Sequence, residues 1–265
     1  MIKIFSYGGG VQSTAALVLQ TQGKLEFDKF VFANVGDDSE NPETLKYFRE
    51  VALPFAKKNN VDIVEVRKTT RGKEETLLNY MYRIEKGIAI PLRMNGNGAP
   101  GNRTCTNNFK IYQIEKYVKS LGVKKYIAGL GISTDEIHRA RSEEWTQTIY
   151  KNLEVKRTYP LIKLNISRKD CKAIIKNVGL PIPPKSACWF CPFTRHLEWV
   201  EMRMQNPERF EKVVEIEKMM QEKRKKINKD PVWYHPSLKP LEVAVGLQEN
   251  FFDELDNCES GYCMI

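Results

Sequence analysis

The sequence lacks any run of about 18 apolar residues, the length that a membrane-spanning helix needs. Its start, Met1-Ile2-Lys3-Ile4-Phe5, lacks the basic stretch and the long apolar stretch of a secretory signal. Internal repeats and low-complexity tracts are missing as well. These absences predict a protein without a membrane span that resides in the cytoplasm.

Histidine is scarce, with three residues, whereas cysteine occurs six times. In a reducing compartment, six cysteines argue against a disulfide framework and for metal, cluster or thiol chemistry. Only one Cys-x-x-Cys pair is present, so a zinc site with four thiolates would have to collect them from scattered positions.

The composition, with 42% hydrophobic and 28% charged residues, is typical of a packed protein and excludes a disordered, collagen-like or coiled-coil chain. Lysine and arginine number 42 against 33 acidic residues, which gives a net charge of +9. A positive field of this size favours polyanionic partners, meaning nucleic acid or phosphorylated small molecules. Solubility alone is an equally good explanation of the charge.

Apolar strand patterns alternate with helical patterns in the first half of the chain. The predicted elements are strands at Ile2–Ser6, Phe30–Ala33, Val61–Val66 and Lys125–Ala128, and helices at Gln12–Thr21 and from Pro42 to about Asn59, with Asn41 as N-cap. This alternation predicts an α/β fold with a doubly wound, mostly parallel sheet that binds ligands at the carboxyl ends of its strands.

The second half of the chain has a different texture. The segment Lys68–Arg103 interrupts the alternation and ends in a glycine-rich loop, which either lines a site or is a surface insertion. Beyond Pro160, Lys163–Gly179 and Glu198–Asn228 have helical patterns. We therefore expect a nucleotide-binding α/β domain over residues 1–162 and a helical region over residues 163–265, which carries the Cys-x-x-Cys pair and a cysteine-containing tail.

A glycine-rich loop, Ser6-Tyr7-Gly8-Gly9-Gly10-Val11-Gln12-Ser13-Thr14, joins the first predicted strand to the first predicted helix. Adjacent glycines let the backbone N–H groups approach a phosphate, and a helix N-terminus adds partial positive charge. A tight turn without a ligand is the simpler interpretation, but three adjacent glycines exceed what a turn requires. The loop is neither a Walker A motif, because no lysine follows, nor a dinucleotide fingerprint, because its spacing differs.

The run Gly8-Gly9-Gly10-Val11-Gln12-Ser13 resembles the SGGxDS loop of the adenine nucleotide alpha hydrolase superfamily, which includes PP-loop ATP pyrophosphatases and the reductases of phosphoadenylyl sulfate (PAPS) and adenylyl sulfate. Gly8 replaces the usual serine, and Gln12 replaces the usual aspartate. That aspartate is associated with the metal–pyrophosphate centre of the pyrophosphatases. Gln12 therefore weakens the case for magnesium-assisted ATP cleavage but not the case for nucleotide binding.

Two further segments resemble the PAPS reductase-like family. Asn34-Val35-Gly36-Asp37-Asp38 with Asn41-Pro42-Glu43-Thr44 is similar to the DTG…PET segment, and Gly129–Ser133 with Asp135, Glu136 and Arg139 is similar to the segment after the fourth strand. The resemblance covers roughly residues 1–200 in order. The nucleotide-binding residues that it implies are Ser6, Gly8, Gly9, Gly10, Gln12, Ser13, Thr14, Asn34, Gly36, Gly129, Gly131, Asp135 and Arg139.

Three charged residues near these motifs, an acidic pair and an arginine, have alternative interpretations. Asp37 and Asp38 are either solvated acidic residues near a helix N-terminus or, if Mg²⁺ is used, its replacement ligands, and we take Asp37 as a candidate catalytic residue. Arg139 either binds the phosphate or sulfate of a substrate or pairs with Glu143 and Glu144.

Cys188-Trp189-Phe190-Cys191 can bring two thiolates to one metal; a redox pair and two buried structural cysteines are the alternatives. Cys105 lies in a segment that resembles the CCxxRK segment of the reductases, which contributes ligands to a 4Fe–4S cluster, although Thr106 replaces the second cysteine. The resemblance implies a cluster held by Cys105, Cys188 and Cys191. Its fourth position is either filled by Cys258 or Cys263, of which we choose Cys263, or left open, as in cluster-dependent tRNA thiolases. Zinc is the alternative metal.

The remaining cysteines and a basic segment complete the candidates. Sulfonucleotide reductases carry a nucleophilic cysteine near the C-terminus, and Cys258 and Cys263 loosely match it; a tail with incidental cysteines is the simpler interpretation. Cys171 is expected to be a core residue. The lysines and arginine between Lys218 and Lys229 either contact a phosphate backbone or form a solvated helix face.

These observations support three hypotheses. The first is an iron–sulfur PP-loop enzyme that binds ATP or another adenine nucleotide, adenylates an acceptor, with tRNA or DNA favoured, and transfers sulfur to it from a donor. The second is a sulfonucleotide reductase that uses Cys258 or Cys263 with a thiol reductant. The third, suggested by Gln12, is a non-catalytic module that binds nucleotides or nucleic acid.

Overall fold

The computed structural model describes residues 1–94 and 98–246. The chain divides into two compact units. Of the described residues, unit 1 contains Met1–Thr76 and Thr106–Trp189, and unit 2 contains those of Leu77–Cys105 and of 190–246. Neither unit has the bounds expected from the sequence, 1–162 and 163–265, and those domain bounds stay a prediction.

Unit 1 is built on a six-stranded sheet with the order β3-β2-β1-β7-β9-β8. Its strands are β1 (Ile2–Tyr7), β2 (Lys29–Asn34), β3 (Ile63–Arg67), β7 (Lys125–Leu130), β8 (Trp145–Gln147) and β9 (Glu154–Thr158). All neighbouring strands pair in parallel except β8, which runs antiparallel to β9. The strand order reverses between β1 and β7, and such a switch point is where open parallel sheets bind ligands at their carboxyl edge.

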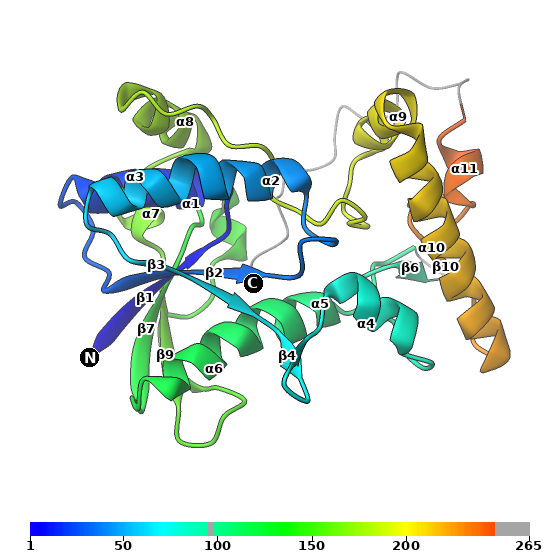
Figure 1. Ribbon diagram of the computed structural model, residues 1–265, viewed down its shortest axis with the longest axis horizontal. Helices are drawn as coiled ribbons and strands as arrows, with labels where there is room; N and C mark the ends of the chain where they lie inside the picture. The colour runs from blue at the N-terminus through cyan, green and yellow to red at the C-terminus, as the bar shows by residue number, and fades with distance from the viewer. Residues whose placement is uncertain (95–97, 247–265) are drawn as a thin grey trace. The chain divides into compact units, whose positions relative to one another are not determined.

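Helices cover both faces of this sheet, with α1 to α3 on one face and α6 on the other (Figure 1). The helices of unit 1 are α1 (Val11–Thr21), α2 (Pro42–Tyr47), α3 (Leu53–Lys58), α6 (Tyr112–Ser120), α7 (Pro160–Lys163) and α8 (Arg168–Asn177). Shorter elements are the π-helices η1 (Phe48–Ala52) and η2 (Asn107–Ile111), the 3-10 helix η3 (Thr134–Arg139), and the hairpin β4 (Thr69–Thr70) and β5 (Lys73–Glu74). The helix α5 (Thr104–Thr106) lies at the boundary of the two units.

The core of unit 1 has two layers because successive residues of a strand point to opposite faces. On one side, Phe5 and Phe30 stack with their ring centroids 4.8 Å apart, in the cluster that includes α1 and α8. On the other side, Ile4 and Val31 belong to a cluster with Val118 of α6. The predicted doubly wound, mostly parallel α/β fold is confirmed.

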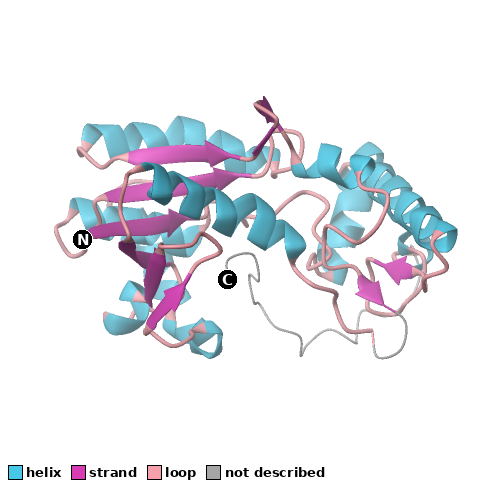
Figure 2. Ribbon diagram, turned by 90° about the horizontal axis from the view of Figure 1, so that it is seen from below, coloured by secondary structure: helices cyan, strands magenta, loops and turns pink. Residues whose placement is uncertain are grey.

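Unit 2 is mainly helical and contains a short two-stranded sheet (Figure 2). Its elements are α4 (Leu77–Arg83), β6 (Arg93–Met94), α9 (His196–Gln205), α10 (Pro207–Lys226), β10 (Val232–Trp233) and α11 (Leu241–Ala244). The predicted helical C-terminal region is thus confirmed, and Asn206 ends the first long helix and caps the second by accepting a hydrogen bond from the Arg209 N–H at 3.2 Å. Within residues 1–94 and 98–246, every helix is too short or too polar to cross a bilayer.

Candidate nucleotide site at the carboxyl edge of unit 1

The glycine-rich loop lies at the carboxyl end of β1, beside the switch point. Gly9 has a φ of +76°, and a Cβ at this position would lie 2.9 Å from Cγ2 of Thr44, so both the backbone and the neighbouring side chain require glycine. Gly10 is the N-cap of α1, and the Ser13 hydroxyl donates to its carbonyl oxygen at 3.0 Å. The loop therefore leads directly into the first turn of α1, which is the arrangement that binds phosphates in other proteins.

Other predicted nucleotide-binding residues take different positions in the same region. Thr14 is fully buried, with its hydroxyl 3.1 Å from that of Tyr7, and Ser6 lies within the central strand β1. Gly129 lies inside β7, where a Cβ would sit 2.4 Å from the Phe27 ring, so packing explains this glycine. Gly131 is different, because its Cβ would lie 3.3 Å from the Ser13 nitrogen, against the first turn of α1. Their roles in binding stay predictions.

Position 12 belongs to a polar network. The side-chain amide of Gln12 donates to the Glu136 carboxylate at 3.3 Å and accepts a hydrogen bond from Nη1 of Arg168 at 3.0 Å. Arg139 pairs with Glu136 at 2.8 Å, and both side chains are at most 7% exposed. The pairing considered for Arg139 with Glu143 and Glu144 is thus replaced by a buried ion pair within η3.

Asp135, a predicted nucleotide-binding residue, positions the start of α8. Its Oδ2 accepts hydrogen bonds from the Arg168 backbone N–H and from the Ser133 hydroxyl, the latter at 3.3 Å. A hydrogen bond to the first N–H of a helix fixes where the helix begins. Asp135 therefore holds Arg168 beside the glycine-rich loop.

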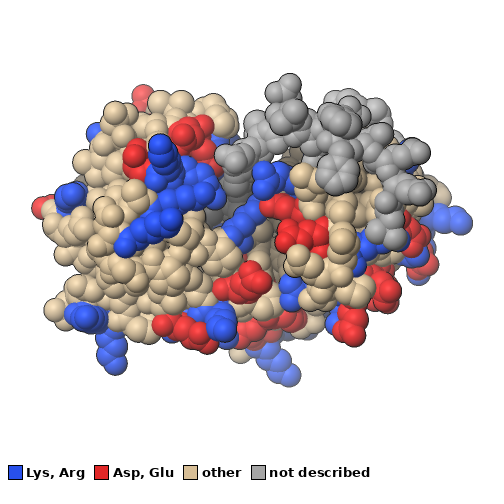
Figure 3. All heavy atoms as spheres, turned by 90° about the horizontal axis from the view of Figure 1, so that it is seen from above, with Lys and Arg blue, Asp and Glu red and all other residues tan. Residues whose placement is uncertain are grey.

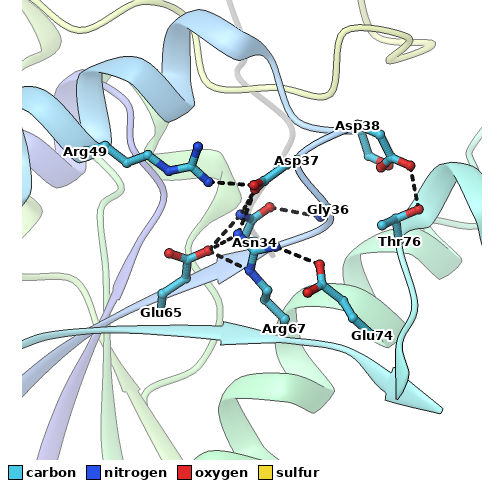
Figure 4. Close-up of polar contacts among 10 residues, drawn as sticks. Asn34, Gly36, Asp37, Asp38, Arg49, Glu65, Arg67, Glu74 and Thr76 are labelled. Atoms are coloured by element: carbon cyan, nitrogen blue, oxygen red, sulfur yellow. Dashed lines mark hydrogen bonds and ion pairs between the residues drawn. The ribbon is translucent and has the colours of Figure 1, made fainter. Parts of the chain in front are cut away.

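The acidic loop after β2 forms a second network (Figure 4). The Asp37 carboxylate accepts hydrogen bonds from Arg49 and Arg67, each at 2.7 Å, and from the Asn34 amide at 2.8 Å. Partial burial by itself would raise the pKa of Asp37, but these hydrogen bonds and the charges of the two arginines lower it below its usual value. Asn34 in turn accepts a hydrogen bond from the Gly36 N–H at 2.9 Å.

Asp38, next in the chain, is bonded to different neighbours. Its carboxylate accepts hydrogen bonds from the hydroxyls of Ser39 at 2.7 Å and Thr76 at 2.9 Å. Gly36 has a φ of +121°, and a Cβ there would lie 2.4 Å from the Thr76 Cβ, so the turn requires glycine. Both carboxylates of the acidic pair are therefore engaged in hydrogen bonds within unit 1.

A segment from much later in the chain, Lys185–Trp189, lies along the loop and the acidic segment. The Ser186 hydroxyl donates to the Gly8 carbonyl oxygen. Cys188 forms an antiparallel bridge with Glu40, and the Trp189 indole donates to the Asp38 carbonyl oxygen at 2.7 Å. The first cysteine of the Cys-x-x-Cys pair is thus held beside the acidic loop after β2.

The three predicted cluster cysteines are divided between the two units. Cys188 belongs to unit 1, and Cys105 and Cys191 belong to unit 2. In the part of the chain that the structure describes, no three His, Cys, Asp or Glu side chains gather closely enough to hold a metal ion. Cys258 and Cys263 lie outside the described residues. Cys171 is fully buried, as predicted, and burial raises the pKa of its thiol to about 12.

Some of the basic side chains of α10 are engaged in hydrogen bonds and ion pairs within unit 2. Lys223 donates to the carbonyl oxygens of Met81, Tyr82 and Ile84, at the end of α4, at distances of 2.7 to 2.9 Å. Lys218 pairs with Glu242 at 3.1 Å. On the face of the molecule drawn in Figure 3, basic side chains form small groups with acidic side chains between them.

A hollow of about 470 Å³ nevertheless lies along this helix. It is lined by Lys218, Gln221, Glu222, Lys225, Lys229 and Pro231. Three lysines against one glutamate leave its lining positively charged.

Sequence reasoning missed the residues that surround the predicted ones, above all Arg49, Arg67, Arg168 and Ser186. Arg168 had a usable signal, because it begins a helix that was predicted to start nearby, at Lys163. Ser186 had none, since a serine between prolines and a cysteine has no distinctive pattern.

No protein-family model matches the chain, and no curated protein matches it either. Among solved structures, the chain is similar to the U34-tRNA thiolase NcsA from Methanococcus maripaludis, solved with its 4Fe–4S cluster. The sequence identity is 14% and the TM-score 0.45, over 82% of this chain and 71% of the thiolase chain. Values this low assign no activity, ligand or cofactor to this chain.

Proposed function

We propose that unit 1 binds an adenine nucleotide at its carboxyl edge, with the phosphates at Gly8–Gly10 and the first turn of α1. One observation carries this proposal: four segments that are far apart in the sequence meet at the carboxyl edge of the sheet, beside its switch point. They are the glycine-rich loop, the acidic loop after β2, the segment Gly131–Arg139, and Lys185–Trp189, linked by the contacts of Gln12, Ser186 and Trp189.

The reaction that we propose for this site is sulfur transfer through an adenylate. An acceptor oxygen attacks the α-phosphorus of ATP, the new P–O bond forms, and pyrophosphate leaves with the electron pair of the broken P–O bond. A hydrosulfide donor then attacks the activated carbon, AMP leaves with the oxygen and the electron pair of the broken C–O bond, and loss of the proton from sulfur completes the thio product. In the first step, the backbone N–H groups of α1 hold the departing phosphates.

A nucleic acid is the acceptor that the charge favours. The net charge of +9 raises the local concentration of polyanions, and the hollow along α10 offers Lys225 and Lys229 to a phosphate backbone. Both lysines are exposed. tRNA and DNA share this backbone chemistry, so the two are compared as acceptors.

The cluster at Cys105, Cys188 and Cys191 stays a prediction from the sequence. The adenylation step needs none of these thiols, so the proposed nucleotide binding does not depend on them. Anaerobic purification followed by iron, sulfide and zinc assays tests the metal separately, with Cys188→Ala as the variant and Cys171→Ala as a control for the loss of a buried thiol.

Nucleotide binding is tested with substitutions at Gly10, the N-cap of α1. Asp and Asn are both favourable N-cap residues, and a Cβ at this position would meet its nearest neighbour, Ser186, at an ordinary 3.6 Å. Gly10→Asp places a negative charge at the phosphate site, whereas Gly10→Asn does not. We expect ATP affinity, measured by calorimetry, to fall more than tenfold in Gly10→Asp relative to Gly10→Asn. Equal affinities would place the phosphates elsewhere.

The reaction itself is tested by ATP–pyrophosphate exchange with tRNA or DNA present. Exchange that depends on one nucleic acid supports adenylation of that acceptor. Sulfite release from PAPS or adenylyl sulfate, lost in Cys263→Ser or Cys258→Ser, would instead support a sulfonucleotide reductase. Nucleotide binding without either turnover would support a non-catalytic module.

A further inference from the structure

We propose that the nucleotide's phosphate charge is offset at this loop by the guanidinium of Arg168, and not by a magnesium ion held by the carboxylates of the chain. The proposal rests on the nucleotide site proposed above. It concerns how that site handles charge, which the sequence resemblance leaves open, because Gln12 stands where the related loops have aspartate.

Position 12 does not fit a magnesium ligand. Mg²⁺ is bound in proteins mainly through carboxylates, phosphates and water. The amide oxygen of Gln12 already accepts a hydrogen bond from Arg168 at 3.0 Å, and its amide nitrogen donates to Glu136 at 3.3 Å. A cation at this oxygen would have to displace a guanidinium. Position 12, which is an aspartate in the related loops, therefore binds an arginine in this chain.

The acidic pair does not fit either. The Asp37 carboxylate is shared by two guanidinium groups, those of Arg49 and Arg67, which neutralise it and lower its pKa. The oxygens of Asp38 are bonded to the hydroxyls of Ser39 and Thr76. A magnesium ion would need to break the Asp37 ion pairs before it gained a ligand, so the expected replacement ligands are engaged elsewhere.

Arg168 has the charge and the geometry for a phosphate. Its backbone N–H is held by Asp135, which fixes the start of α8, and its side chain reaches Gln12 in the first turn of α1. Within the described residues, its guanidinium donates one hydrogen bond, to a neutral amide, and forms no ion pair. Arg139, by contrast, is buried against Glu136. Arg168 therefore has further N–H donors beside the loop that are available to a phosphate.

The first test measures ATP binding to the full chain by calorimetry, once with EDTA and once with Mg²⁺. We expect the two affinities of the wild type to agree within about threefold. Arg168→Ala should weaken binding by about tenfold to a hundredfold in both buffers, the range for losing a hydrogen bond to a charged group. Arg168→Lys should recover part of this loss, and Lys169→Ala, an exposed neighbour in α8, should change little.

The second test restores the carboxylate with Gln12→Asp. This change removes the donor to Glu136, places two carboxylates together and neutralises Arg168. Binding in EDTA should fall at least tenfold, and Mg²⁺ should restore it, because the new carboxylate supplies a metal ligand. Near-ultraviolet circular dichroism of each variant checks that the fold is retained.

The outcomes separate the two proposals. Wild-type binding that needs Mg²⁺ and is unchanged in Arg168→Ala would overturn the role of Arg168 while leaving the nucleotide site in place. No ATP binding by the wild type in either buffer would overturn the proposed function, and the role of Arg168 with it.

Discussion

The carboxyl edge of unit 1 and helix α10 of unit 2 both concentrate charge, but they assemble it in opposite ways. At the edge, the charged groups come from positions far apart in the sequence, such as Glu136 and Arg168 around Gln12. In α10, the basic residues follow one another in the sequence, and Lys223 and Arg224 are bonded to backbone carbonyl oxygens of unit 2. The charge cluster of α10, which is visible in the sequence, thus partly serves local structure, whereas the network beside the candidate site cannot be recognised from the sequence.

The largest effect that sharpens this comparison is expected at Glu217 in α10. Its buried carboxylate accepts hydrogen bonds from the backbone N–H groups of Tyr234 and Leu241, each at 2.8 Å. Glu217→Ala removes the carboxylate that accepts both hydrogen bonds and leaves a cavity in its place, which should lower the free energy of unfolding by about 2–5 kcal/mol. Urea unfolding measures this loss, with the exposed Glu215→Ala as control. If both variants lose equally little stability, this carboxylate does not hold the segment from Tyr234 to Leu241 against α10.

Two glycines of unit 1 separate stability from ligand binding. Gly129→Ala forces a methyl group against the Phe27 ring and should cost about 1–3 kcal/mol of stability, as overpacking does. Gly131→Ala crowds the Ser13 nitrogen at 3.3 Å and should instead reduce ATP affinity several-fold with a smaller loss of stability. Thermal unfolding and calorimetry on both variants give the two quantities. The opposite assignment of effects would move the binding role from Gly131 to Gly129.

Buried titratable groups predict opposite pH dependences in the two units. In unit 1, burial raises the pKa of Glu115 to about 7, against weaker opposing contributions from the Ile149 backbone and Arg157. Between about pH 4.5 and 7, the folded state holds a proton that the unfolded state has released. The free energy of unfolding therefore falls as the pH rises through this range. Glu115→Gln should flatten that dependence, by at most about 1.4 kcal/mol per pH unit.

In unit 2, burial, with the nearby charges of His196 and Arg93, lowers the pKa of His235 to about 4. Between about pH 6.5 and 4, the unfolded state binds a proton that the folded state does not bind. The free energy of unfolding therefore falls as the pH decreases through this range. His235→Gln should flatten this second dependence. Urea unfolding of both variants at pH 5, 6 and 7 tests the pair, and parallel curves for wild type and variants would contradict both assignments.

The smallest effect concerns the lysines of α10 that line the hollow. The double variant Lys225→Glu/Lys229→Glu should weaken tRNA binding several-fold and reduce the slope of log affinity against log salt by about 1 to 2. Lys57→Glu/Lys58→Glu, with two exposed lysines of α3, makes the same change in net charge. Fluorescence anisotropy across a salt series compares them. Equal losses would mean that net charge, and not the hollow, attracts the nucleic acid.

Local signals account for what the sequence predicts correctly. The glycine run marks the loop between β1 and α1, and Asn41 caps α2 as expected, accepting a hydrogen bond from the Glu43 N–H at 3.0 Å. The predicted strands at Ile2–Ser6 and Phe30–Ala33 agree with β1 and β2. Each of these features depends on a few adjacent residues.

Features that depend on distant partners were missed. Strand β9 contains Glu154, Lys156 and Arg157 and lacks an apolar run, and it is specified by its parallel pairing with β7. A helix start is predicted near Arg168, but its partner Gln12 lies 156 positions away, and no local pattern identifies that contact. That Cys105, Cys188 and Cys191 hold a cluster and that Cys258 or Cys263 is catalytic remain predictions from the resemblance alone.

The hydrogen bond from Ser186 to Gly8 can form only late in the synthesis of unit 1. It joins residues 178 positions apart, so the loop is synthesised well before Ser186, and this contact forms only after Ser186 follows. Contacts of such long range form after the loop-closure entropy has been overcome, which places them late in folding. During synthesis, the glycine-rich loop is therefore present before its partner Ser186, and the candidate site is complete only when most of unit 1 has left the ribosome.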